Sequence, residues 1–235
     1  MEQREGNRGS KIAPPQPLPV ETSPWEAAYL RFETPEQEII KFQKRLKKMG
    51  VTRLPRDSHL VEIFCGRGGG LHALQQFGFT HLEGVDLSEN LVRQYHGDAQ
   101  LYVSDCRRMP FRSQSKDVLI VQGGLHHLLA LPDDLERTVA EAKRVLKPGG
   151  RFVIVEPWRT PFLSFVHVVC ANPLARRLWD KLDALQVMTE HEIVTYEQWL
   201  SAPQLVLGVI TKHFSPVYQT IGWGKLNFVG TPTAL

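Results

Sequence analysis

A glycine-rich run with acids on either side could bind a nucleotide. Gly66 and Gly68 stand in the run Cys65–Gly70, which directly follows the apolar run Val61–Phe64. Glycine lets a backbone pass close to a ligand and adopt positive φ. Asp86 comes eighteen residues after Gly68, where an acid can accept hydrogen bonds from both ribose hydroxyls. The turn, the acid and their spacing together predict a nucleotide site.

The residues around this turn argue against two common phosphate-binding motifs. A dinucleotide fingerprint needs a third glycine where Leu71 stands, and no Lys-Ser or Lys-Thr pair ends the run as in a Walker loop. Glu62 precedes the turn, and a carboxylate there repels a pyrophosphate but suits an ammonium group. The sequence therefore favours a ligand with an ammonium group over one with a pyrophosphate.

Two histidines and a glutamate could act on a substrate in the same crevice. His126 and His127 follow the apolar run Asp117–Gln122, and Glu156 ends the later run Arg151–Glu156. A doubly wound sheet places its ligand crevice at such strand ends, and an imidazole titrates near neutrality. His126 is the candidate general base, although one ring could only pack or orient the loop. Glu156 could face the substrate or simply cap the segment that follows.

Strand-like and helix-like segments alternate along the middle of the chain. Short apolar runs are separated by segments with helical spacing between His59 and Glu156. This alternation predicts an α/β fold with a doubly wound, mostly parallel sheet. The predicted strands are His59–Phe64, His81–Leu87, Gln100–Val103, Asp117–Gln122 and Arg151–Glu156, and the helices between them are Leu71–Phe77, Ser88–Tyr95 and Pro132–Leu146.

The two ends of the chain depart from this alternation. Residues 1–24 are rich in proline and charge and predict a disordered leader before a folded domain at 25–235. Residues 157–212 predict a helical cap inserted before the last two strands. Those strands, His213–Ile221 and Lys225–Gly230, are antiparallel because a tight turn joins them. The cap helices are predicted at Phe162–Cys170, Pro173–Leu185 and Tyr196–Leu200.

Five short motifs occur in order along this middle segment. They are Glu62-x-Phe64-x-Gly66-x-Gly68, Gly84–Ser88, Ser104–Cys106 with Met109–Phe111, Asp117–Gln122 with Leu125–Leu128, and Arg144–Gly150. In these motifs the segment resembles the class I S-adenosylmethionine-dependent methyltransferases, and more narrowly the type 11 group that includes the ubiquinone/menaquinone methyltransferases. The resemblance covers about 100 of the 235 residues. It implies a Rossmann-like, seven-stranded methyltransferase domain.

The resemblance implies S-adenosylmethionine as cofactor and a role for each motif residue. The cofactor's ammonium would lie at Glu62, its ribose at Asp86 and its sulfonium beside Gln122. The Cys106 thiol is typical of a small apolar filler. The other implied contacts are the backbone of Gly66 and Gly68 at the methionine part, Leu87 beside the adenine, Asp105 at the adenine amino group and the Cys106 amide at a ring nitrogen.

Phe64 departs from the family pattern, because the family usually has glycine at this position. Its ring could narrow the cofactor pocket or pack under the sheet. The same departure resembles a motif of some RNA and DNA methyltransferases, yet the chain contains neither a Pro-Cys nucleophile nor an Asn-Pro-Pro-Tyr motif. We therefore expect Phe64 to affect cofactor affinity rather than the fold.

The expected reaction is methyl transfer to a small acceptor. Apolar residues such as Trp158 and Phe162 occur throughout the predicted cap, which favours a hydrophobic or aromatic acceptor. They could also be the cap's own core or a homodimer surface. RNA or protein methylation is the alternative among enzymes, and a non-catalytic S-adenosylmethionine-binding module is the alternative outside them. Trp25, Tyr29 and Phe32 could form a lid over the cofactor, with Arg31 near its carboxylate, or could belong to the core.

Composition limits the partners and the location of the protein. The net charge, 28 − 25 = +3, argues for neither a nucleic-acid nor a membrane partner. No apolar run is long enough to span a bilayer. Three scattered cysteines form no Cys-x-x-Cys pair and no Cys/His cluster with zinc spacing, which predicts no metal site and a reducing, cytoplasmic location.

Overall fold

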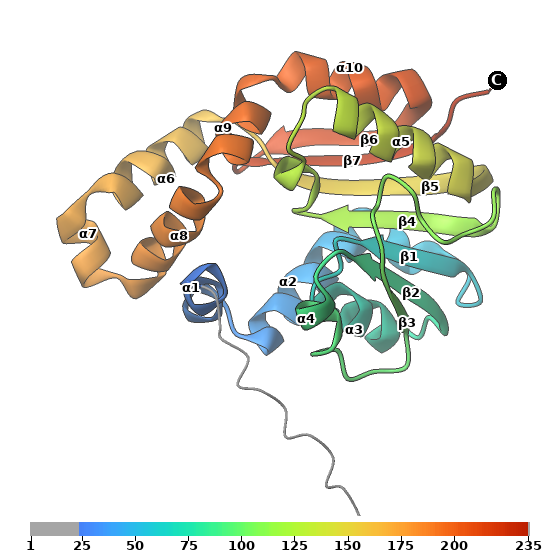
Figure 1. Cartoon of the computed structure of the whole chain (residues 1–235), viewed down its shortest axis with the longest axis horizontal. Coiled ribbons are helices and arrows are strands. Elements are labelled where there is room, and N and C mark those ends of the chain that lie inside the picture. Colours follow the sequence, from blue (N-terminus) through green and yellow to red (C-terminus); the bar gives the residue numbers. More distant parts are fainter. Residues whose placement is uncertain (1–23, 235) are drawn as a thin grey trace, which may run out of the picture.

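The computed structural model describes residues 24–234, apart from the side chains of residues 24–26 and 30 (Figure 1). The leader predicted over residues 1–24 lies outside the described residues except at its last position. The described chain forms a seven-stranded sheet with helices on both faces and a helical cap beyond one end. The short helices at the strand ends are η1 (Val51–Arg53), α4 (Glu89–Val92) and η2 (Leu125–His127).

The sheet has the strand order β3-β2-β1-β4-β5-β7-β6. Its strands are β1 (His59–Ile63), β2 (His81–Asp86), β3 (Gln100–Val103), β4 (Lys116–Gln122), β5 (Leu146–Pro157), β6 (Phe214–Gly222) and β7 (Lys225–Pro232). The first five pair in parallel, whereas β7 is antiparallel to both β5 and β6. This confirms the predicted mostly parallel sheet with an antiparallel C-terminal strand.

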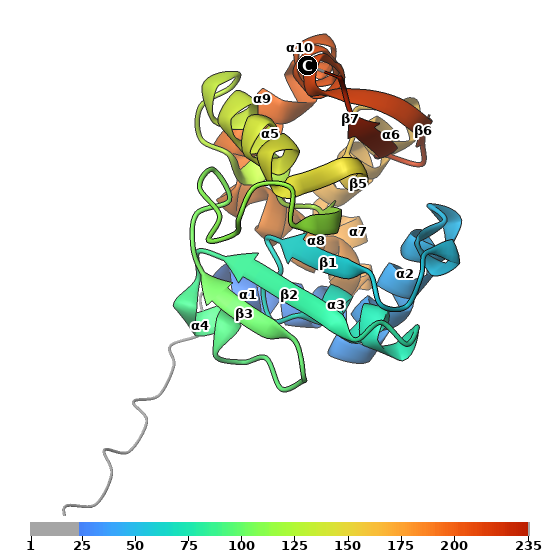
Figure 2. The ribbon, with the colours of Figure 1, turned by 90° about the vertical axis from the view of Figure 1, so that its right-hand side faces the viewer.

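Helices cover both faces of the sheet and enclose its core (Figure 2). Successive side chains of a strand point to opposite faces, so Val61 and Ile63 pack into one core cluster and Leu60 into the other. The first cluster lies under α5 (Asp133–Val145) and α10 (Pro203–His213), and the second under α2 (Pro35–Lys48) and α3 (Gly69–Gln76).

The strand order reverses between β1 and β4. Strands β1, β2 and β3 run outward to one edge, and the chain then returns to place β4 on the other side of β1. In open α/β sheets, ligands bind in the crevice outside the carboxyl ends of the strands at such a reversal. The glycine-rich turn after β1 and the η2 segment after β4 both lie there.

A helical cap lies beyond the carboxyl ends of the parallel strands (Figure 1). Its α8 packs against α1, the first described helix. The prediction of one helix over Pro173–Leu185 is wrong, because extended backbone at Trp179 (φ −140°, ψ 100°) separates two helices. The helices concerned are α1 (Pro24–Phe32), α6 (Pro161–Ala171), α7 (Pro173–Leu178), α8 (Asp180–His191) and α9 (Ile193–Ser201).

Trp199 joins the cap to the sheet. Its ring is fully buried, and its indole N–H donates a hydrogen bond to the carbonyl oxygen of Pro157 at 2.8 Å. The ring also stands edge-on to Trp158, with ring centroids 6.3 Å apart. Both tryptophans belong to the core cluster that α5 and α10 cover. Across residues 24–234, no helix is both long and apolar enough to cross a membrane.

Candidate functional site

The turn after β1 adopts a left-handed backbone at three positions. The φ angle is 54° at Phe64, 52° at Gly66 and 81° at Gly68. A Cβ atom at Gly68 would lie 2.2 Å from the ring of Tyr95, so both the backbone angle and the space require glycine there. The turn therefore packs its backbone closely against the Tyr95 ring, which is the close approach that glycine in the sequence predicts.

Asp86 fixes this turn to the end of β2. One oxygen of its carboxylate accepts a hydrogen bond from the amide of Gly66, and the other accepts one from the amide of Ser88, both at 2.8 Å. A carboxylate has about four acceptor positions, so Asp86 can still accept hydrogen bonds from a ligand. Leu87, next to it, is 64% exposed and could contact a base. This arrangement is compatible with the predicted ribose and adenine contacts.

Glu62 and Gln122 form a polar pair on neighbouring strands inside the sheet. Gln122 Nε2 donates a hydrogen bond to Glu62 Oε1 at 3.3 Å, and Glu62 is 3% exposed. Glu62 Oε2 and Gln122 Oε1 are both buried and have no hydrogen-bond partner among the described residues. Burial raises the pKa of Glu62 to about 8. An ammonium group would supply both hydrogen-bond donors and a positive charge, so the pair fits such a ligand.

Tyr29, Glu38 and Arg67 form a cluster beside the turn that the sequence did not predict. The Tyr29 hydroxyl donates a hydrogen bond to Glu38, and Arg67 Nη2 lies 3.5 Å from a Glu38 oxygen. The Arg67 guanidinium also lies 5.1 Å from the centroid of the Tyr29 ring, and its Nε is buried without a partner in the described chain. Arg67 thus places a positive charge at the turn. Its position within the glycine-rich run is the sequence feature from which this role could have been predicted.

Asp105 and Cys106 lie after β3, as predicted, but the Asp105 carboxylate is already engaged. It accepts hydrogen bonds from the amide of Arg107 at 2.8 Å and from the Arg107 guanidinium at 2.7–3.0 Å. Hydrogen bonds from Arg107 hold the pKa of Asp105 below its usual value. The Cys106 thiol is buried 3.7 Å from the Thr138 hydroxyl, in agreement with its expected role as filler. An adenine amino group would have to share Asp105 with Arg107.

The Phe64 ring packs against Gly124, in the loop that follows β4. A Cβ atom at Gly124 would lie 2.3 Å from Phe64 Cγ, so glycine at that position makes room for the ring. A left-handed backbone angle is costly for a residue other than glycine, and the surrounding structure has to hold it in place. Phe64 contributes to the core cluster on this side of the sheet. The ring therefore has a packing role, one of the two alternatives expected for it.

His126 and Glu156 form a buried pair at the ends of β4 and β5. His126 Nδ1 lies 2.8 Å from Glu156 Oε2, and Glu156 is fully buried. Glu156 Oε1 accepts hydrogen bonds from the amides of Gly124 and Leu125 at 2.9 and 2.8 Å. Burial raises the pKa of Glu156, but His126 and these amides lower it below its usual value. The backbone thus fixes the carboxylate, and the carboxylate fixes the imidazole.

Glu192, between α8 and α9, adds a second carboxylate that the sequence did not predict. Its two oxygens lie 3.6 Å from His126 Nε2 and 3.6 Å from His127 Nδ1. Burial lowers the pKa of His126, but hydrogen bonds with Glu156 and Glu192 outweigh it and raise that pKa to about 9. Burial and the neighbouring His126 lower the pKa of His127. Although the sequence predicted no metal site, these three residues form a group that could hold a metal ion.

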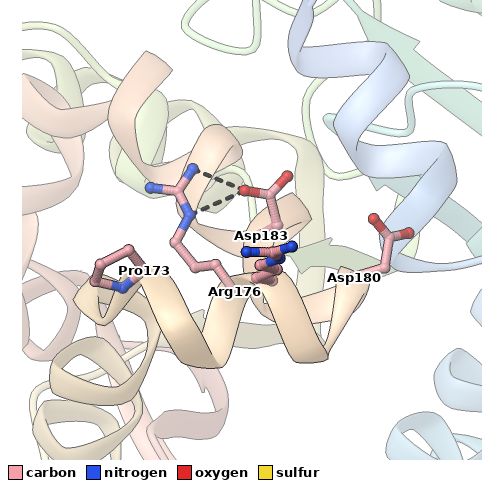
Figure 3. A pocket seen from close by; sticks show the side chains of 5 residues that line it. Pro173, Arg176, Asp180 and Asp183 are labelled. Carbon is pink, nitrogen blue, oxygen red and sulfur yellow. Dashed lines mark hydrogen bonds and ion pairs between the residues drawn. The ribbon is translucent and has the colours of Figure 1, made fainter.

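A separate hollow of about 420 Å³ lies in the cap, away from these residues. Figure 3 shows the Arg176 guanidinium bonded to Asp183 at its edge. Arg31 was expected near the cofactor carboxylate, but it pairs instead with Asp180 at 2.9 Å and Asp183 at 3.0 Å and so ties α1 to α8. No residue predicted to bind the cofactor lines this hollow, whose lining residues are Pro173, Arg176, Arg177, Asp180 and Asp183.

A comparison with protein families matches the part of the chain that contains the candidate site at the strand ends. Residues 61–154, less than half of the chain, match the family model described as a methyltransferase domain. In this segment the chain is similar to the class I S-adenosylmethionine-dependent methyltransferases. The matched residues run from β1 to β5 and include the glycine-rich turn, Asp86, Asp105 and His126. S-adenosylmethionine is the methyl donor of this methyltransferase family.

Curated relatives of the methyltransferase domain act on apolar small molecules, according to their names. Sterol 4-C-methyltransferase strm-1 of Caenorhabditis elegans is 27% identical over 143 residues, which are 55% of this chain and 41% of the relative. The mitochondrial 2-methoxy-6-polyprenyl-1,4-benzoquinol methylase of Xenopus laevis is 28% identical over 148 residues, 61% of this chain and 43% of the relative. The chain thus matches less than half the length of these two relatives.

Solved structures share the fold over most of the chain. The PH0226 protein of Pyrococcus horikoshii is 17% identical with a TM-score of 0.64, and the match covers 90% of this chain and 99% of that one. Geranyl diphosphate C-methyltransferase of Streptomyces coelicolor, solved with S-adenosylhomocysteine, is 14% identical with a TM-score of 0.59 and coverages of 92% and 87%. These likenesses confirm the methyltransferase fold.

Proposed function

We propose that this chain transfers a methyl group from S-adenosylmethionine to a small, apolar acceptor. The observation that carries the proposal is the buried pair Glu62 and Gln122, each with an unpartnered oxygen, beneath the turn that Asp86 fixes. When bound, the cofactor supplies an activated methyl group on its sulfonium. The protein then has to hold the cofactor and the acceptor in line and exclude water.

The cofactor side of the crevice would be held by charge and hydrogen bonds. Glu62 would bind the ammonium group and would lose its proton when that cation arrives. Asp86 would accept hydrogen bonds from the ribose hydroxyls while it keeps its bond to the Gly66 amide. Leu87 would pack beside the adenine, and Asp105 and the Cys106 amide would contact its edge. The backbone of Gly66 and Gly68 would line the methionine part.

The acceptor side would be served by His126 and Glu156. Glu156 holds His126 Nδ1, so that Nε2, which lies 3.6 Å from Glu192, is the ring nitrogen that an acceptor could reach. If the acceptor is a hydroxyl, the neutral form of His126 would take its proton as the oxygen–methyl bond forms and the methyl–sulfur bond breaks, which leaves S-adenosylhomocysteine. The pKa of about 9 means that this neutral form is a minority at neutral pH in the free protein.

An apolar acceptor fits the surroundings of His126. The ring of Tyr196 stands edge-on to the imidazole, with ring centroids 5.8 Å apart. Tyr196 is partly buried against the core, on α9, which packs against η2. Apolar walls with a few polar groups are typical of sites for hydrophobic ligands. The sterol and polyprenyl quinol named for two curated relatives belong to the same chemical class.

The proposal is tested first by calorimetric titration with S-adenosylmethionine and, separately, S-adenosylhomocysteine. We expect both to bind, and Asp86→Asn to abolish binding because it weakens the acceptor for both the ribose and the Gly66 amide. The matched control is Asp57→Asn, an exposed aspartate before β1, at the opposite end of the strand. Failure of the wild-type protein to bind either compound would contradict the proposal.

Turnover tests the acceptor side once a panel of lipophilic hydroxyl compounds has been screened for S-adenosylhomocysteine release. His126→Ala should lower turnover by about 10²–10⁴-fold, the usual contribution of a general base. Its affinity for S-adenosylhomocysteine should stay unchanged. His81→Ala, which removes an exposed imidazole, is the control. Wild-type turnover in His126→Ala would remove it as the base.

A further inference from the structure

We propose that His126, His127 and Glu192 bind a divalent transition-metal ion of the zinc class. One ligand atom from each residue lies within 4.8 Å of the other two. Two imidazoles and one carboxylate are a ligand set of catalytic zinc sites. Imidazole nitrogen favours zinc, cobalt or iron over magnesium and calcium, which prefer oxygen ligands alone. The set is assembled from η2 and from the junction of α8 and α9.

The distances are close to those that a bound ion would impose. Zinc bonds of about 2.0–2.2 Å place neighbouring ligand atoms of a tetrahedron about 3.4 Å apart. Glu192 Oε2 lies 3.6 Å from His126 Nε2, and Glu192 Oε1 lies 3.6 Å from His127 Nδ1. One ligand atom from each residue lies within 4.8 Å of the others, so side-chain movements that close this spacing bring all three atoms to one ion.

Glu156 supplies the support that metal-binding histidines usually have. A ligating imidazole generally donates its second ring N–H to a carboxylate, which fixes the tautomer and the orientation of the ring. Glu156 Oε2 lies 2.8 Å from His126 Nδ1, and the amides of Gly124 and Leu125 hold its other oxygen. His126 Nε2 is then the ring atom that can bind an ion beside Glu192.

Charge and burial also favour a cation at this place. The cluster sets two carboxylates, Glu156 and Glu192, against two imidazoles that are neutral when they bind a metal. The side chains of His126 and Glu192 are 10% and 19% exposed, so solvent competes weakly, while His127 at 35% leaves a path of entry. A bound ion would therefore neutralise charge that the protein has buried.

Three protein ligands leave one position of a tetrahedral ion open. If the proposed methyl transfer is correct, an oxygen or sulfur atom of the acceptor could occupy that position, and the ion would favour its deprotonated form. With its Nε2 bound to the ion, His126 would then act as a ligand, and the ion would replace it as the group that favours loss of the acceptor proton. This assignment of the acceptor class rests on the proposed function. Metal binding itself does not, because it needs neither cofactor nor acceptor.

Titration of the chelator-treated, full-length protein with Zn²⁺ by calorimetry tests the site directly. We expect one equivalent to bind, and Co²⁺ to give the visible absorption of a tetrahedral complex. Glu192→Gln and His127→Asn should each weaken Zn²⁺ binding by at least about 10-fold, and Glu156→Gln by about 10–100-fold as for other supporting residues. Circular dichroism confirms that each variant is folded.

Two variants control for adventitious binding by surface histidines. His81→Gln breaks the stacked pair that His59 and His81 form on the surface, and His191→Gln removes the exposed imidazole next to Glu192. Both should bind Zn²⁺ like the wild type. The proposal is overturned if no equivalent binds, if Glu192→Gln binds normally, or if His81→Gln abolishes binding. S-adenosylhomocysteine titrated into the same samples reports the cofactor site separately.

Discussion

In the free protein, only one of the two carboxyl oxygens of Glu62 has a hydrogen-bond partner among the described residues. Gln122 donates a hydrogen bond to one oxygen, whereas the other has no partner among the described residues. Because burial raises its pKa from 4.5 to about 8, the folded chain keeps a proton at neutral pH that the unfolded chain releases. An ammonium group would displace this proton, since an adjacent cation favours the carboxylate.

We expect Glu62 to destabilise the free protein progressively as pH rises from 4.5 to about 8. In this window the folded state binds more protons than the unfolded state, so the free energy of unfolding falls with pH. Glu62→Gln removes this contribution, and its unfolding free energy should fall less steeply than that of the wild type. Urea denaturation at several pH values measures both slopes. Glu89→Gln, at an exposed site, should keep the wild-type slope, and equal slopes for Glu62→Gln would contradict the assignment.

The structure brings together those predicted site residues that stand at the ends of predicted strands. Asp86 ends a strand and binds the turn, and His126 meets Glu156 because parallel strands end at the same edge. Glu192 could not be predicted in this way, since it lies 66 positions after His126 on an ordinary polar helix end. Glu38 was missed for the same reason, because only tertiary packing directs one polar position of an amphipathic helix toward the turn.

At the scale of the elements, the cap depends on one tryptophan. Trp199→Phe should cost about 1–3 kcal/mol, because it removes the buried indole N–H that donates to the partly buried Pro157 carbonyl. Trp199→Ala should cost about 3–5 kcal/mol, because it also opens a cavity in the core. Trp179→Phe is the matched control, since Trp179 is 62% exposed, and its stability should stay within about 0.5 kcal/mol of the wild type. Urea denaturation measures all three. A Trp199→Phe variant as stable as the control would contradict the proposed anchoring.

The strands could be predicted from sequence better than the cap helices. Strands β1 and β4 carry short apolar runs because both faces of the sheet are covered there, whereas β3 contains no buried residue. The helix expected over Pro173–Leu185 breaks at Trp179, where no glycine or proline marks a boundary. Asp180 and Asp183, just after the break, pair with Arg31 of α1. Such contacts with a distant helix are invisible to a local pattern.

At the scale of the whole molecule, the candidate site is built from segments distant in sequence. Helices α1 and α2 bring Tyr29 and Glu38 to the glycine-rich turn, and the junction of α8 and α9 brings Glu192 to η2. Arg31 links α1 to α8 and so connects these two sides. A ligand that bridges the turn and η2 would therefore contact residues from both halves of the fold.

Such a ligand should stabilise the entire domain against heat. Binding to the folded state alone at about 100 times Kd adds about 2.7 kcal/mol to the free energy of unfolding. For a chain of this size each kcal/mol raises Tm by about 2–4 °C, so saturating S-adenosylhomocysteine should raise it by about 5–10 °C.

Because the site spans both halves of the fold, near-ultraviolet circular dichroism and far-ultraviolet circular dichroism should show the same shift. Asp57→Asn should respond like the wild type and Asp86→Asn should not respond. A shift in only one of the two signals would mean that unfolding is not two-state and that the ligand does not stabilise the domain as one unit.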